Sequence, residues 1–219
     1  MKLCMIQKRI DDTDITAWLD RAADESPDIV ALAELATTGC LYQPRTVPTL
    51  EQTLSWLEPY PFAILVGLPF RDAAGLHNAY VYYYQGKYQL YTKINLFEPF
   101  DEPRVYRAGT RLGLFETDHD RLGVAICYDL RFDDIFARLK EAGASKVFVP
   151  AAFPAERTDD YVRLLSERAV EHRYYVFGIN AVGRDERHQY GGRSRAVAPD
   201  GTVLASADET AETVITVSI

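Results

Sequence analysis

Short apolar segments of β-strand length recur along this chain, and they limit its fold more than any other feature. The pattern predicts strands at residues 3–7, 29–34, 63–68, 80–84, 88–93, 112–117, 122–126, 146–150, 175–181, 194–198, 203–205 and 214–217. Helices are predicted at fewer places, namely 14–23, 50–57, 132–142 and 159–173. Many strands with few helices favour two sheets stacked face to face with helices outside. We therefore predict an α/β protein built as a four-layer α-β-β-α sandwich.

The chain contains no linker, repeat or low-complexity tract that would divide it. We therefore predict a single domain over residues 1–219, a size at which a domain buries ~70% of its unfolded surface. The Gln-Gly-Lys sequence at 85–87 predicts a hairpin turn, and the prolines within 94–108 predict a loop there.

The charge balance argues against two classes of partner. The formal net charge is −8 and no lysine- or arginine-rich run occurs, so neither nucleic acid nor an anionic membrane is expected to bind. A small-molecule substrate, neutral or anionic, remains open. The three cysteines are irregularly spaced, which favours a reducing compartment over a disulfide framework. We find no signal-peptide segment and no apolar run of transmembrane length, so we expect a cytoplasmic protein.

Three chemically capable side chains stand at the ends of predicted strands: Glu34, Lys93 and Cys127. Cys127 lies at a strand-to-helix turn, where a helix N-terminus is expected to lower the thiol pKa. Each residue also has an ordinary interpretation: a buried core cysteine, a surface carboxylate and a solvated edge lysine. Together they supply a nucleophile, a base and a cation, which is a workable set for acyl transfer.

The segments around these residues, 32–34, 91–97 and 123–132, resemble the nitrilase, or carbon–nitrogen hydrolase, superfamily in order and spacing. Later segments resemble further blocks of the same family: 152–154, 168–171, Asn180 and 190–194. The resemblance implies a sandwich of the nitrilase type, a Glu34–Lys93–Cys127 triad, and Glu102 as a second carboxylate beside Lys93. The chain departs from the family at Ala33, Asp133-Asp134 and His172, and its segments 7–29 and 39–50 are shortened.

The resemblance also implies a mechanism and a substrate class. Glu34 takes the thiol proton, the Cys127 thiolate attacks an amide carbonyl, and Lys93 with the backbone N–H of Tyr128 stabilises the oxyanion. The 127–132 and 152–154 segments are most similar to the omega-amidase branch, which hydrolyses short amides such as 2-oxoglutaramate. A nitrilase, an N-carbamoyl amidase or a catalytically silent binding protein are the alternatives.

A substrate of this kind carries a carboxylate, which a guanidinium binds well. Substrate-binding candidates are Arg131, Phe153, Tyr42 and Arg157. Arg131 has an alternative interpretation, as an ion-pair partner of Asp129 or Glu102. Arg157 has one too, as a solvated residue at the entry to a helix.

No cofactor and no metal are expected, because the histidines and cysteines lack HxxxH or CxxC spacing. The absence of a GxSxG segment disfavours a serine hydrolase. Family members usually pair through the helices that follow Cys127 and Pro154, so a homodimer or larger homo-oligomer is expected. The candidate contact residues on those helices are Phe136, Leu139, Tyr161 and Leu165.

Overall fold

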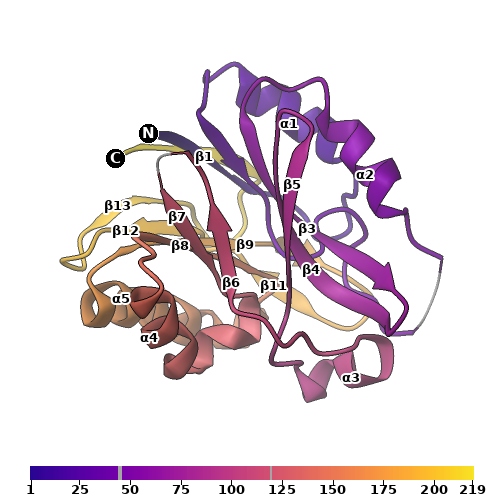
Figure 1. Ribbon diagram of the computed structural model, residues 1–219. Helices are drawn as coiled ribbons and strands as arrows, with labels where there is room; N and C mark the ends of the chain where they lie inside the picture. The colour runs from indigo at the N-terminus through magenta and orange to yellow at the C-terminus, as the bar shows by residue number, and fades with distance from the viewer. Residues whose placement is uncertain (44–45, 119) are drawn as a thin grey trace.

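Two mixed six-stranded sheets face each other in the computed structural model, which describes residues 1–43, 46–118 and 120–219 (Figure 1). The first sheet has the order β14 (Thr213–Ser218), β1 (Lys2–Gln7), β2 (Ile29–Ala31), β3 (Ala63–Asp72), β4 (Gly75–Tyr84) and β5 (Lys87–Thr92). The second has the order β13 (Val203–Ser206), β12 (Arg195–Val197), β9 (Tyr175–Asn180), β8 (Lys146–Ala151), β7 (Arg121–Val124) and β6 (Gly113–Glu116).

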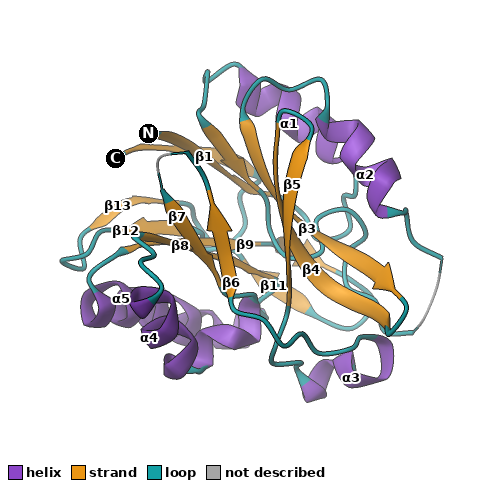
Figure 2. Cartoon of the chain, in the orientation of Figure 1, coloured by secondary structure: helices purple, strands orange, loops and turns teal. Residues whose placement is uncertain are grey.

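Helices cover the outer face of each sheet, which completes the four layers (Figure 2). Helices α1 (Ile15–Ala23) and α2 (Leu50–Leu57) lie over the first sheet, while α4 (Asp133–Glu141) and α5 (Thr158–His172) lie over the second. The predicted α-β-β-α sandwich is confirmed. Among the described residues, no helix is both long and apolar enough to cross a membrane.

Side chains on each strand alternate between two apolar layers. In β1, Leu3 and Met5 point to the other sheet, whereas Cys4 and Ile6 pack with Trp18 and Leu19 of α1. Asp14 caps α1, because its carboxylate accepts hydrogen bonds from the backbone N–H groups at the start of the helix.

The direction of the strands brings distant segments to one edge of the sandwich. Strands β1, β2 and β3 are mutually parallel, as are β7, β8 and β9. Strand β5 returns to the direction of β3 because β4 is antiparallel to both of them. Residues that follow β2, β5, β7 and β8 are therefore expected to meet, as at the carboxyl edge of other parallel sheets.

Some element predictions were wrong at one end, and some short elements were not predicted. The strand predicted at 29–34 stops at Ala31, and Glu34 lies in the turn that follows. The predicted loop at 94–108 contains a 3₁₀ turn, η1 (Glu98–Phe100), and the short helix α3 (Glu102–Val105). A hairpin of β10 (Val182–Arg184) and β11 (Gln189–Gly191) was not predicted.

The four residues predicted to form the oligomer interface are wrong. Phe136, Leu139, Tyr161 and Leu165 are each 0% exposed. Their side chains form the core between the second sheet and its helices. These four residues therefore stabilise the chain itself and are unavailable to a second copy.

Candidate active site

A cavity opens at the edge where the carboxyl ends of the strands meet. The residues that line it come from both sheets and from the loops after them: Glu34, Cys40, Lys93, Phe97, Phe100, Glu102, Cys127, Tyr128, Arg131, Ala152, Phe153, Pro154 and Arg157. The four residues that the sequence proposed for catalysis are all among them.

Glu34 is held in the turn after β2, and its side chain is 3% exposed. Its Oε1 accepts hydrogen bonds from Asn78 Nδ2 at 2.7 Å and Lys93 Nζ at 2.9 Å. Its Oε2 accepts one from the backbone N–H of Ala152 at 2.9 Å, which reaches across from the second sheet. The interpretation of Glu34 as a surface carboxylate is therefore wrong.

Lys93 follows β5 and lies between two carboxylates, with 1% of its side chain exposed. Its Nζ donates to Glu34 Oε1 at 2.9 Å and to Glu102 Oε1 at 2.8 Å. Burial alone would lower the pKa of Lys93, but the charges of Glu102 and Glu34 outweigh burial and raise that pKa well above its usual value. Lys93 is thus a fixed cation rather than a solvated edge lysine.

Glu102 opens α3 and is the second carboxylate that contacts Lys93. Its Oε2 accepts a hydrogen bond from the backbone N–H of Phe97 at 2.6 Å. Burial, with a smaller contribution from the charge of Glu34, raises the pKa of Glu102 although Lys93 opposes the shift. Glu102 therefore lies beside Lys93, as the family resemblance implies.

Cys127 begins the 3₁₀ turn η2 (Cys127–Arg131), which follows shortly after the end of β7 at Val124. Its φ of +47° lies in the left-handed region, which non-glycine residues rarely adopt. Burial and the charge of Glu34 raise the pKa of the Cys127 thiol well above its usual value, despite Lys93 and a backbone contact with Ala152. The expected lowering of this pKa by a helix N-terminus is wrong, because burial raises it instead.

A buried carboxylate that the sequence analysis missed holds η2 in position. Asp129 is 0% exposed and accepts hydrogen bonds from Tyr91 Oη at 2.7 Å and from the backbone N–H of Ile126 at 3.0 Å. It also accepts two from Asn95, at 2.8 and 2.9 Å. Asp129 thus ties the Cys127 turn to the segment that carries Lys93. Its position two residues after the cysteine was visible in the sequence, but the partners were not.

The predicted substrate-binding residues differ in their surroundings. Arg131 lines the cavity, pairs with Asp160 at 3.0 Å and lies over the Phe153 ring at 5.8 Å, so its predicted alternatives Asp129 and Glu102 are not its partners. Arg157 also lines the cavity and is exposed. Within residues 1–43, 46–118 and 120–219, no hydrogen bond or ion pair involves its guanidinium.

Phe153 lines the cavity, and its backbone N–H donates to Asn180 Oδ1 at 2.8 Å. Tyr42 is not brought into the cavity. Its hydroxyl donates to Asp185 Oδ2 at 2.5 Å and lies 3.2 Å from the hydroxyl of Tyr190. The structure therefore does not place Tyr42 with the predicted catalytic residues, and the hydroxyl that was predicted to bind substrate is already engaged.

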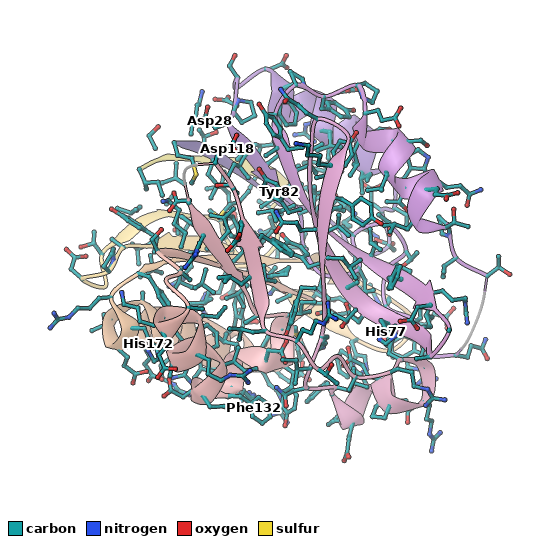
Figure 3. The ribbon with its side chains drawn as sticks, viewed as in Figure 1. Asp28, His77, Tyr82, Asp118, Phe132 and His172 are labelled. Atoms are coloured by element: carbon teal, nitrogen blue, oxygen red, sulfur yellow. The ribbon has the colours of Figure 1, made fainter. Side chains whose placement is uncertain are left out.

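A second, larger cavity of about 580 Å³ lies at the opposite end of the sandwich. Figure 3 shows Asp28, Tyr82 and Asp118 near that end, and Phe132, which follows η2, near the other. No cysteine lies among the described residues of its wall. The larger cavity therefore lacks the nucleophile that the smaller one contains.

Among the residues that the structure describes, one group of potential metal ligands is found, on the helical layer: Asp133, Glu171 and His172 (Figure 3 labels His172). Spacing in the sequence did not reveal it. Arg168 already contacts Asp133 at 3.0 Å and Glu171 at 2.9 Å, so a cation is present between these carboxylates. The group is an ion-pair cluster between α4 and α5.

The comparison with known proteins agrees with this geometry. The pattern that defines the carbon–nitrogen hydrolase family matches residues 4–219. A 2-oxoglutaramate amidase of Bacillus subtilis is 30% identical over 190 residues, which covers 81% of this chain and 73% of that protein. Omega-amidase YafV of Escherichia coli K12 is 36% identical over 124 residues, covering 56% of this chain and 48% of that protein.

Among solved structures, an amidase from Nesterenkonia sp. has the same fold. It superimposes with a TM-score of 0.90 at 20% identity and covers 100% of this chain and 90% of that one. With the family pattern matched over nearly its whole length, the chain belongs to the carbon–nitrogen hydrolase family and is a hydrolase that acts on carbon–nitrogen bonds.

Proposed function

We propose that the protein is an amidase that converts a small amide to a carboxylate and ammonia through a thioester on Cys127. The observation on which this rests is the position of Cys127 in one cavity with the buried Glu34–Lys93–Glu102 cluster. The names of the relatives support an amide substrate.

In the proposed first half-reaction, Glu34 accepts the Cys127 proton as the sulfur attacks the amide carbonyl carbon. The raised pKa of the Cys127 thiol makes such a base necessary. Lys93 and the backbone N–H of Tyr128 stabilise the oxyanion, a contribution of roughly 3–4 kcal/mol per donor. Collapse of the tetrahedral intermediate breaks the carbon–nitrogen bond, and Glu34 returns the proton to the departing ammonia.

In the second half-reaction, Glu34 removes a proton from water, which attacks the thioester carbonyl. The carboxylate product then leaves and the thiol regains its proton. Glu102 also accepts a hydrogen bond from Lys93, so that the ammonium keeps its place when Glu34 is transiently neutral.

We infer that the substrate is a short dicarboxylate monoamide, of which 2-oxoglutaramate is an example. Besides Lys93, two cationic side chains, Arg131 and Arg157, line the cavity of a chain whose net charge is −8. Arg131 already pairs with Asp160, so Arg157 is the better candidate for the substrate carboxylate.

Ammonia release from a substrate panel tests the function. We expect turnover of 2-oxoglutaramate and succinamate, and no turnover by Cys127→Ala, which removes one sulfur and leaves the core packing intact. Circular dichroism serves as the folding control. A Cys127→Ala variant with near wild-type activity would discard the thioester mechanism. A panel of amides, nitriles and N-carbamoyl compounds without any turnover would favour a silent binding protein.

Arg157 is tested with a matched pair of substrates, succinamate and butyramide, which share a four-carbon chain and differ in the carboxylate. Arg157→Met should raise KM for succinamate about tenfold, because a hydrogen bond to a charged group contributes roughly 1.5–3 kcal/mol. KM for butyramide should stay unchanged. The same comparison on Arg131→Met is the control, and equal losses on both substrates would assign a structural role to the arginine concerned.

We also propose that the protein is a homodimer or larger homo-oligomer, with contacts other than the four buried residues named above. Sedimentation velocity at micromolar concentration measures this directly, and a monomer would contradict it.

A further inference from the structure

Asn78 contacts all three members of the buried Glu34–Lys93–Glu102 cluster, although nothing in the sequence drew attention to it. It lies in β4 and is 0% exposed. Its Nδ2 donates to Glu34 Oε1 at 2.7 Å and to Glu102 Oε1 at 3.4 Å. Its backbone carbonyl accepts a hydrogen bond from the Lys93 backbone N–H at 2.8 Å. One residue therefore touches both carboxylates and the segment that carries the ammonium.

The other end of the same side chain has no hydrogen-bond partner. Asn78 Oδ1 is buried, and no donor among the described residues reaches it. An orphaned buried acceptor costs roughly 1–3 kcal/mol. Turning the amide over would place Oδ1 against two carboxylate oxygens, so the carboxylates set its orientation. A side chain retained for stability would not leave one polar atom unpaired, which suggests that its donor end has a functional role.

The charges of the cluster explain why the donor is a neutral amide. Glu34 and Glu102 supply two negative charges and Lys93 one positive charge, so the buried group is negative overall when both carboxylates are ionised. A second lysine in place of Asn78 would complete the neutralisation and weaken Glu34 as a base. An amide stabilises the carboxylate by hydrogen bonding and leaves its charge available for the thiol proton.

We propose that Asn78 is a positioning residue of this active site, whose side-chain amide donates to the Glu34 carboxylate and holds it in place for proton transfer from Cys127. The inference rests on the proposed function. It concerns a residue that acts through Glu34 and does not itself touch the substrate.

The experiment compares Asn78→Leu and Asn78→Asp with wild type, using kcat, KM and the pH profile of kcat/KM for the best amide of the panel. Leucine has the shape of asparagine and no polar atoms. For Asn78→Leu we expect kcat to fall at least tenfold with KM nearly unchanged. The acid limb of the profile should move to higher pH, because the Glu34 carboxylate has lost a donor. The melting temperature is measured in parallel as the folding control, because the variant loses both the orphaned acceptor and the hydrogen bonds to the two buried carboxylates.

Asn78→Asp supplies the rescue. A protonated aspartic acid can still donate to Glu34, while an ionised one repels it. This variant should therefore be more active than Asn78→Leu at low pH and lose activity as the pH rises through a range where wild type does not. It also decides the question if the leucine variant folds poorly.

Gln89→Leu is the matched control, because Gln89 lies on the neighbouring strand and, among the described residues, its side-chain amide bonds to Glu116 backbone groups alone, at 2.6 and 2.9 Å. It should leave kcat and the pH profile unchanged. An Asn78→Leu variant with wild-type kcat, or with reduced kcat but an unmoved acid limb, would overturn the proposal. Because Cys127→Ala is assayed beside it, loss of this inference is distinguishable from loss of the proposed function.

Discussion

Lys8 is a charged residue that the fold encloses away from the active site. It is 2% exposed, and its Nζ donates to the backbone carbonyls of Arg9, at 3.4 Å, and Asp12. Burial lowers the pKa of Lys8 to about 8, although Asp12 and Glu212 oppose the shift. Because the unfolded chain keeps the ordinary value near 10.5, folding is linked to the charge of this one side chain.

We predict that Lys8→Met stabilises the protein at neutral pH by up to roughly 3 kcal/mol, which is the free energy that corresponds to the lowering of the Lys8 pKa. Below pH 8 both states hold the proton and the penalty of the buried charge is fully present. Between about pH 8 and 10.5 the folded chain has released the proton while the unfolded chain keeps it, so the wild type gains stability with rising pH. Urea unfolding of both proteins at pH 7 and pH 10 measures the difference, which should shrink at the higher pH.

Single residues show what could be predicted at the site. Glu34, Lys93 and Cys127 were recognisable because each follows an apolar strand and lies in a segment with a family pattern. Asn78 was not, because one amide within the apolar strand β4 has no local signal, and its partners are 44 and 24 residues away. The hydrogen bond between Tyr42 and Asp185, 143 residues later, depends on the whole fold. The sequence therefore could not show that the Tyr42 hydroxyl is already engaged.

At the scale of elements, β3 positions Glu34 through a glycine. A Cβ at Gly67 would lie 2.4 Å from the carbonyl oxygen of Ala33, 2.5 Å from the backbone nitrogen of Leu35 and 2.8 Å from the carbonyl carbon of Glu34. All three are backbone atoms and cannot move aside as a flexible side chain would. Only glycine lets the Glu34 turn pack directly on the strand.

We predict that Gly67→Ala destabilises the protein by about 1–3 kcal/mol, as overpacking does, and also lowers kcat about 100-fold, because the base is displaced. Gly123→Ala in β7 is the control. There a Cβ would meet side chains, Val147 at 2.9 Å and Leu139 at 3.1 Å, so stability should fall while kcat of the folded enzyme remains. Equal kcat values for the two variants, measured after correction for the folded fraction, would contradict the role of Gly67.

Elements with a strong pattern were predicted well, and those defined by long-range contacts were not. Helix α2 was predicted at its observed bounds, Leu50–Leu57, and in the structure a Thr49–Gln52 capping box marks its start. Strands β10 and β11 have three residues each, too few for a periodic pattern to emerge. Helix α3 was hidden because Pro103 suggested a loop, although proline is tolerated in the first turn of a helix.

At the scale of the whole molecule, the number of strands was sufficient to predict two stacked sheets, but their order was not predictable. The pairing of β1 with β14 joins Lys2 to Ser218, and no local feature of either strand specifies the other. Sheet order therefore follows from tertiary packing, which a single sequence does not display.

The hydrogen bond from Ala152 to Glu34 has a consequence for how the enzyme loses activity. It joins residues that follow strands of different sheets, so base and nucleophile share one site only while the two sheets are docked. Trp18 and Trp56 lie in α1 and α2, on the outer side of the first sheet alone. Turnover therefore measures whether the two sheets are docked. Tryptophan fluorescence measures whether the first sheet and its helices are folded. For a cooperative, all-or-none domain the two signals should disappear in urea with the same midpoint. Activity lost at a lower urea concentration than fluorescence would reveal an intermediate in which the halves have separated while one of them is still folded.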